Sequence, residues 1–128
     1  MMKRDMDLVR LILLKVEKEH SSGPLYNLKI DGYSNEQVPY HCKILFEAGL
    51  LSDYISNNAG NKLYIFSVCG LTWDGYDFLE KIRDDSTWKK VKEIAKEHGL
   101  PLLIDTIKQI SSNIISSMTE GAIKAILK

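Results

Sequence analysis

The chain has 128 residues, of which 45% are hydrophobic and 27% are charged. These proportions are those of an ordinary globular domain, and they exclude a disordered or fibrous chain. Seventeen Lys and Arg residues balance seventeen Asp and Glu residues, so any basic surface that contacts nucleic acid has to be local.

The cysteines and the apolar runs exclude further classes of protein. Cys42 and Cys69 are far apart and form no Cys-x-x-Cys spacing, so we expect free thiols rather than a metal or redox site. No apolar run approaches the roughly 20 residues of a membrane span, and Asp5, Asp7 and Arg10 interrupt any signal-peptide core. We therefore expect a cytoplasmic protein that contacts no membrane and holds no metal or cofactor.

The N-terminal third predicts one helix and one short strand. Residues 5–19 carry apolar side chains at helical spacing, namely Val9, Ile12, Leu13 and Val16. Residues 25–30 alternate between apolar and polar side chains, which is the pattern of a strand with one buried face.

The central segment predicts a helix followed by a β-hairpin. Ser34 and Gln37 form a capping box for the helix, and Gly49 is placed to end it in a left-handed conformation. The inward residues of this helix are Val38, Cys42 and Leu45. Strands are predicted over residues 50–55 and 63–68, with a polar turn over 56–62 between them. Helix, strand, turn and strand in this order are typical of a winged helix-turn-helix.

The C-terminal part predicts three more helices. Thr72 caps the first, which runs to about residue 84 and has Gly75 on its inner face, where a missing side chain allows close packing. Helices over residues 87–98 and 102–127 follow. We predict a mostly helical α+β fold, with a winged-helix domain over 1–85 and a two-helix extension over 86–128.

The last predicted helix suggests self-association. At 1.5 Å per residue it is near 40 Å long, which is more than a compact domain of this size needs. We therefore expect a homodimer, with a candidate interface formed by Leu103, Ile107, Ile110, Ile114 and Met118.

Three blocks of the sequence resemble one family. They are MKRDMDLVRLILLKVE (2–17), GYSNEQVPYHCKILFEAGLL (32–51) and LTWDGYDFLEKIRDDSTWKKVK (71–92). In this order they resemble a family of small bacterial and phage proteins known as domain of unknown function 2513. The resemblance implies a winged-helix domain with a helical extension, and it implies no established activity.

The middle block resembles, more loosely, the recognition helix and wing of ArsR- or MarR-like repressors. Two features depart from that pattern. Only a few residues separate the strand at 25–30 from the helix at Asn35, so the first helix of the helix-turn-helix is missing or reduced to a turn. Pro39 lies within the segment that would be the recognition helix.

Polar residues on three segments are candidates for contacts with double-stranded DNA. Asn and Gln side chains can bind adenine edges, and Lys can bind guanine or phosphate. The candidates are Asn35, Gln37, Tyr40 and Lys43 on the central helix, Asn58, Asn61 and Lys62 on the hairpin, and Lys3 and Arg4 as an N-terminal arm. Glu36 and Glu47 oppose phosphate binding. The alternative interpretation is a solvated helix face with a polar turn.

The sequence gives little indication of an enzyme. The chain has no Gly-rich phosphate loop, nucleophile elbow or metal-ligand spacing, so we expect no enzyme. The pattern favours a DNA-binding or transcription-associated factor of bacterial or phage origin. The alternative is a winged-helix module that binds another protein and no DNA. The sequence identifies no small-molecule effector.

Overall fold

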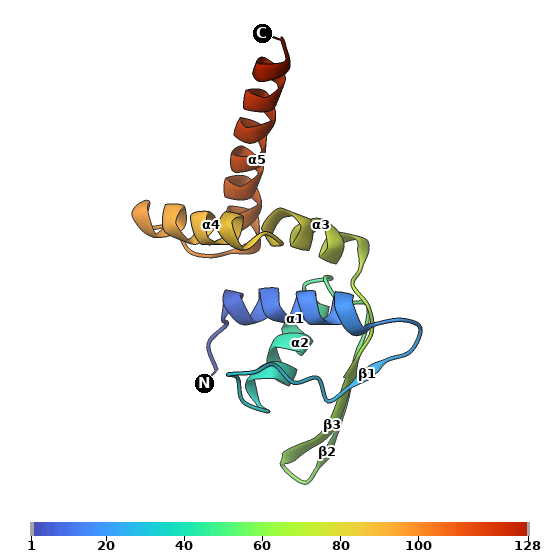
Figure 1. Ribbon diagram of the computed structural model, residues 1–128. Coiled ribbons are helices and arrows are strands. Elements are labelled where there is room, and N and C mark those ends of the chain that lie inside the picture. The colour runs from blue at the N-terminus through green and yellow to red at the C-terminus, as the bar shows by residue number, and fades with distance from the viewer. Residues whose placement is uncertain (1, 128) are drawn as a thin grey trace. The chain divides into compact units, whose positions relative to one another are not determined.

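The computed structural model describes the backbone of residues 2–127 and their side chains, except those of Tyr64 and residues 119–127. It confirms the α+β class and the excess of helix (Figure 1). The helices are α1 (Met6–Glu19), α2 (Gln37–Glu47), α3 (Trp73–Ile82), α4 (Asp85–Glu97) and α5 (Ile104–Leu127), and the strands are β1 (Leu25–Tyr26), β2 (Tyr54–Ala59) and β3 (Lys62–Val68). The chain forms two compact units, Met1–Leu79 and Glu80–Lys128.

Helix α1 supplies much of the core of the first unit. The carboxylate of Asp5 caps it by accepting the N–H groups of Asp7 at 2.9 Å and Leu8 at 3.2 Å, which leaves fewer unsatisfied donors at the helix start. Its buried apolar residues are Met6, Leu8, Val9, Ile12, Leu13 and Val16. Helix α1 packs against α2, so two amphipathic faces meet in one core.

Helix α2 begins at Gln37, two residues after the predicted Asn35, although the predicted capping hydrogen bonds form. The N–H of Gln37 donates to Oγ of Ser34 at 3.0 Å, and the N–H of Ser34 donates to Oε1 of Gln37 at 2.9 Å, which confirms the capping box. The predicted inward residues Val38, Cys42 and Leu45 are all buried. Gly49 follows the helix with a φ of 79°, a conformation that glycine adopts without strain.

The sheet is antiparallel and has the strand order β1-β3-β2. Strand β1 pairs with the end of β3, with Leu25 opposite Val68. It has only two residues, so the strand predicted over 25–30 is too long. The reason is Asn27, whose φ of 49° turns the chain out of the extended conformation. No helix lies between Tyr26 and Gln37.

The β2–β3 hairpin lies closer to its turn than the sequence predicts, because β2 covers Tyr54–Ala59 instead of residues 50–55 and β3 begins at Lys62 instead of Leu63. Residues that we assigned to a seven-residue turn continue both strands, with Ala59 opposite Lys62, and Gly60 has a φ of 65° in the turn. The register shifts at Asn57 and Asn58, where the partners are Ile65 and Leu63. Polar residues can continue the ladder here because β2 is exposed from residue 55 onward, so neither face needs an apolar side chain.

A close backbone contact fixes the start of α3 in the first unit. Oγ1 of Thr72 accepts the N–H of Gly75 at 3.0 Å and donates to the carbonyl of Gly49 at 2.5 Å. The N–H of Thr72 also donates to the carbonyl of Leu50 at 3.1 Å. A Cβ on Gly75 would lie 2.2 Å from that carbonyl oxygen, which confirms the predicted packing role of this glycine.

The second unit is built on α4 and α5, which pack against each other. Helix α4 begins at Asp85, two residues before the predicted Thr87, because the carboxylate of Asp84 accepts the N–H of Thr87 at 2.9 Å and caps the helix. Its buried residues are Trp88, Val91 and Ala95. In Figure 1 the C-terminal half of α5 continues beyond α4.

Candidate nucleic-acid interface

The side of α2 opposite the core is exposed to solvent. Glu36, Tyr40, Lys43 and Glu47 are all exposed, and their spacing of four, three and four residues places them on one helix face. Tyr40 retains 40% of its accessible surface. The predicted contact residues Tyr40 and Lys43 are therefore available to a partner. On the same face, Glu36 lies before Tyr40 and Glu47 lies after Lys43.

Asn35 and Gln37 differ in how much of each side chain is free. Gln37 is half-buried, and its Oε1 is already used in the capping box. Its N–H₂ group and the second lone pair of Oε1 remain, but the capping bond fixes the orientation in which the amide could meet an adenine edge. Asn35 is exposed and forms no hydrogen bond to another described residue. Its amide can therefore offer both a donor and an acceptor to a base.

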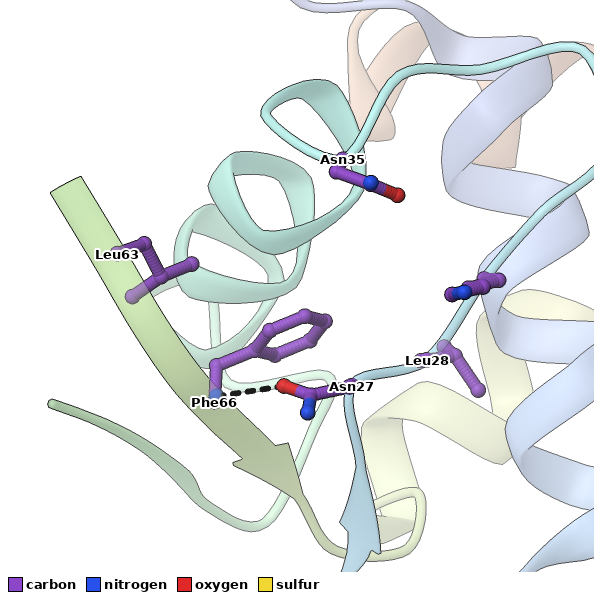
Figure 2. A pocket seen from close by; sticks show the side chains of 6 residues that line it. Asn27, Leu28, Asn35, Leu63 and Phe66 are labelled. Carbon is purple, nitrogen blue, oxygen red and sulfur yellow. Dashed lines mark hydrogen bonds between the residues drawn. The ribbon is translucent and has the colours of Figure 1, made fainter.

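A groove connects the start of α2 with the hairpin (Figure 2). It has a volume of about 240 Å³ and is lined by Asn27, Leu28, Lys29, Asn35, Leu63 and Phe66. The groove thus lies between β3, which contributes Leu63 and Phe66, and the segment before α2, which contributes the other four residues. The sequence did not predict this groove, because Asn27–Lys29 and β3 are far apart along the chain.

The remaining DNA-binding candidates are exposed on the hairpin and before α1. Asn58, Asn61 and Lys62 lie on the distal part of the hairpin, which projects beyond α2 in Figure 1. Lys3 and Arg4 are also exposed. They precede Asp5, whose N–H donates to His41 of α2 at 2.8 Å, so the base of this N-terminal segment is fixed at α2.

His41 is the side chain whose role the sequence analysis missed. It is fully buried, its Nε2 accepts the N–H of Asp5, and its Nδ1 lies 2.8 Å from the carbonyl oxygen of Gln37. A carbonyl only accepts, so Nδ1 donates to Gln37 while Nε2 accepts from Asp5. The partner lies 36 residues away in sequence, and no local pattern indicates such a pair.

Two titratable groups near α2, Cys42 and Tyr33, have pKa values that the fold raises. Burial raises the pKa of the Cys42 thiol to about 12, which keeps it protonated and unreactive near neutral pH. Burial, and then the charges of Asp5 and Asp7, raise the pKa of Tyr33. Within the described part of the chain, no three His, Cys, Asp or Glu side chains are grouped so as to hold a metal ion.

The five candidate interface residues, four in α5 and Leu103 just before it, differ in exposure. Ile107 is fully buried and Ile110 is 8% exposed within the chain, so neither offers new area to a second copy. Leu103 is 45% exposed and Met118 is 64% exposed, whereas Ile114 is intermediate. Among the described side chains, the exposed apolar ones are thus Leu103, one residue before α5, and Ile115 and Met118 near its middle.

Comparison with known proteins agrees with the three sequence blocks. Residues 3–101 match the family described as hypothetical protein (DUF2513). The chain belongs to this family. An uncharacterized protein of Haemophilus influenzae (strain ATCC 51907 / DSM 11121 / KW20 / Rd) is 40% identical over 118 residues, which cover 91% of this chain and 98% of that protein. No solved structure matches the chain.

The family match confirms the resemblance of the three sequence blocks to domain of unknown function 2513. Among the described residues, no helix combines the length and apolar character that crossing a membrane requires.

Proposed function

We propose that the first unit, Met1–Leu79, is a winged helix-turn-helix domain that binds double-stranded DNA. The observation that carries this proposal is the sheet order β1-β3-β2, with α2 directly before the hairpin. In this arrangement α2 is the recognition helix and the β2–β3 hairpin is the wing. The segment between Asn27 and Glu36 takes the place of the first helix of the motif.

The dimensions of α2 suit the major groove. Its 11 residues span roughly 16 Å at 1.5 Å per residue, and the groove of B-DNA is about 12 Å wide and admits one helix. Inserting the exposed face would bring Tyr40 and Lys43 to the base edges. Asn35, at the entry of the helix, would reach a base or the adjoining backbone.

The charge distribution predicts modest affinity. Lys43 on α2, Lys62 on the hairpin, and Lys3 and Arg4 before α1 can each neutralise a phosphate. Acidic side chains at both ends of α2 oppose this attraction. Few phosphate contacts mean a shallow dependence on salt compared with a strongly basic DNA-binding domain.

A pair of charge reversals tests the recognition face. Lys43→Glu lies on the exposed face of α2, and Lys18→Glu lies on an exposed position of α1 and makes the same change in net charge. We expect Lys43→Glu to abolish binding of a short duplex, measured by fluorescence anisotropy, and Lys18→Glu to retain it. Equal losses in the two variants would leave only a non-specific electrostatic effect and would refute the proposed face.

Binding of another protein is the alternative function, and one observation favours it. Trp73 is 82% exposed and Tyr76 is 43% exposed, three residues apart on α3. Exposed aromatic side chains of this kind are enriched at protein interfaces. Under this alternative, Trp73→Ala abolishes binding of the partner, whereas Lys43→Glu leaves it unchanged.

We further propose that the chain forms a homodimer through α5. Leu103 and Met118 supply exposed apolar surface for such a contact. Leu103→Asp with Met118→Asp should shift the protein to monomer in sedimentation equilibrium. Asn113→Asp, a matched change at an exposed position of the same helix, should not. A dimer that persists in the double variant would exclude α5 as the interface.

A further inference from the structure

We propose that the groove between residues 27–35 and β3 binds a small ligand made of one flat ring and one anionic group, such as an aromatic carboxylate. The groove is the one lined by Asn27, Leu28, Lys29, Asn35, Leu63 and Phe66. The proposal does not depend on whether the protein binds DNA.

The size of the groove limits the ligand to one ring. Its volume of about 240 Å³ exceeds the 150 Å³ or so of an engineered cavity that holds benzene. It is below the range of about 300–1,000 Å³ that is usual for sites of larger ligands. A single six-membered ring with one substituent fits these limits, and a dinucleotide does not.

Apolar side chains form one wall of the groove. Phe66 and Leu28 are 5% and 6% exposed, and Leu63 is 39% exposed. In Figure 2 the ring of Phe66 projects from β3 into the space between Asn27 and Asn35. A planar ring can pack against an aromatic side chain in this position, where offset or edge-to-face contacts are favourable.

The polar lining consists mainly of unused hydrogen-bond donors. The N–H of Phe66 donates to Oδ1 of Asn27 at 3.0 Å, which leaves the amide N–H₂ of Asn27 as its free group. The amide of Asn35 and the ammonium of Lys29 have no hydrogen bond or ion pair with another described residue. A ligand that supplies acceptor atoms would match these donors.

The charge of the lining selects an anion. Lys29 is the charged residue of the groove, and the lining includes no Asp or Glu. A carboxylate held by the Lys29 ammonium and the two amides would form charge-assisted hydrogen bonds, which are stronger than neutral ones. A cationic ligand would find no counter-charge among these side chains.

The rigidity of one side of the groove supports a preformed site. Asn27 has a φ of 49° and is held by two hydrogen bonds to Phe66, one from its N–H to the carbonyl at 2.8 Å and one to its Oδ1. A side chain fixed in this way loses little further freedom when a ligand binds, and such preorganisation favours affinity.

The test is a titration of the full chain with benzoate, followed by ¹H–¹⁵N correlation spectra. We expect saturable shifts of the side-chain amide signals of Asn27 and Asn35 and of the backbone amide of Phe66. The dissociation constant should be on the order of 1–10 mM, as suits a ligand of so few atoms. Benzyl alcohol carries the same ring without charge, and phosphate is an anion without a ring. Either should cause much smaller shifts at equal ionic strength.

Two variants assign the interaction to the groove. Lys29→Ala should weaken benzoate binding roughly threefold to fivefold, as expected for a solvent-exposed ion pair. Asn35→Asp adds a carboxylate at the start of α2, where it does not destabilise a helix, and should weaken binding about tenfold or more through repulsion. Three results would each overturn the proposal: no saturable shift at Asn27, Asn35 and Phe66, equal shifts with benzyl alcohol, or unchanged benzoate affinity in Asn35→Asp.

Discussion

The backbone N–H of Asp5 donates a 2.8 Å hydrogen bond to Nε2 of His41. This bond joins the residue that caps α1 to the middle of α2, and the other ring nitrogen of His41 is held by the carbonyl of Gln37. The imidazole therefore connects the two helices that carry most of the core of the first unit. Its role is structural, and it fixes the recognition helix of the proposed DNA-binding domain against α1.

His41→Ala should lower the free energy of unfolding by about 2–4 kcal/mol. The change removes a fully buried side chain and leaves the N–H of Asp5 without its acceptor, and both losses are costly in a core. Urea unfolding followed by far-ultraviolet circular dichroism measures the effect.

Tyr40→Ala is the matched control one residue away. Tyr40 is 40% exposed and lies on the proposed DNA-binding face, so its loss should change stability by less than about 1 kcal/mol while weakening DNA binding. If Tyr40→Ala proves as destabilising as His41→Ala, the division of α2 into a structural and a functional face is wrong.

Gly75→Ala should destabilise the first unit by about 3 kcal/mol or more, because the new Cβ would lie 2.2 Å from the carbonyl oxygen of Leu50 and the backbone has to move. Gly23→Ala is the control, since a Cβ there meets nothing within 4 Å. Thermal unfolding of both variants compares them directly. A Gly75→Ala protein with wild-type stability would contradict the close approach of these two backbones.

Asn27→Ala should lower the free energy of unfolding by about 1–3 kcal/mol, because it leaves the N–H of Phe66 without an acceptor. Asn27→Asp keeps an acceptor oxygen in the same place, and Asp, like Asn, tolerates the left-handed conformation. Its stability should be close to that of the wild type in the same urea experiment. Equal losses in both variants would show that the side-chain oxygen is not what holds this turn.

Cys42 should resist thiol reagents in the folded protein, because it is fully buried and its pKa is raised to about 12 by burial. A Cys69→Ser variant leaves Cys42 as the remaining thiol. We expect no reaction with a disulfide reagent at pH 8 until urea unfolds the chain. Rapid labelling without denaturant would refute the burial of this side chain.

The same pKa shift gives a pH dependence with a definite sign. Because the pKa of the Cys42 thiol is higher in the folded state, the buried thiol stabilises the fold fully at any pH below the usual thiol pKa of about 8.5. This contribution is lost as the pH rises toward 12. The urea midpoint should therefore fall between pH 8 and pH 10 more steeply in the wild type than in Cys42→Ala. Equal slopes in the two proteins would contradict this contribution.

Local signals in the sequence predicted most of the secondary structure. The capping box of Ser34 with Gln37, the terminating Gly49 and the cap at Thr72 all act within a few residues, and the structure confirms each of them. The strand predicted over 25–30 failed because Asn27 adopts a left-handed conformation held by Phe66, 39 residues away. The alternating pattern after it, with Leu28 and Ile30 buried, reflects burial of a loop and not a strand.

The candidate surface was predicted less completely than the fold. Helical periodicity placed Tyr40 and Lys43 outside the core, as the structure shows. The groove at Asn35 depends on segments that only the fold brings together, and the Asp5–His41 bond depends on the packing of α1 on α2. Periodicity also predicted Ile107 and Ile110 as interface residues, although both side chains are buried within the chain itself. An apolar stripe does not reveal which neighbour covers it.

The most direct test of the central claim is fluorescence anisotropy of a labelled mixed-sequence duplex titrated with the full chain at about 50 mM and about 200 mM salt. DNA binding through Lys43, Lys62, Lys3 and Arg4 predicts micromolar affinity at the lower salt concentration and a loss of roughly tenfold or more at the higher one. Absence of binding at the lower salt concentration, or an affinity that does not change with salt, would contradict a phosphate-contacting surface on this domain.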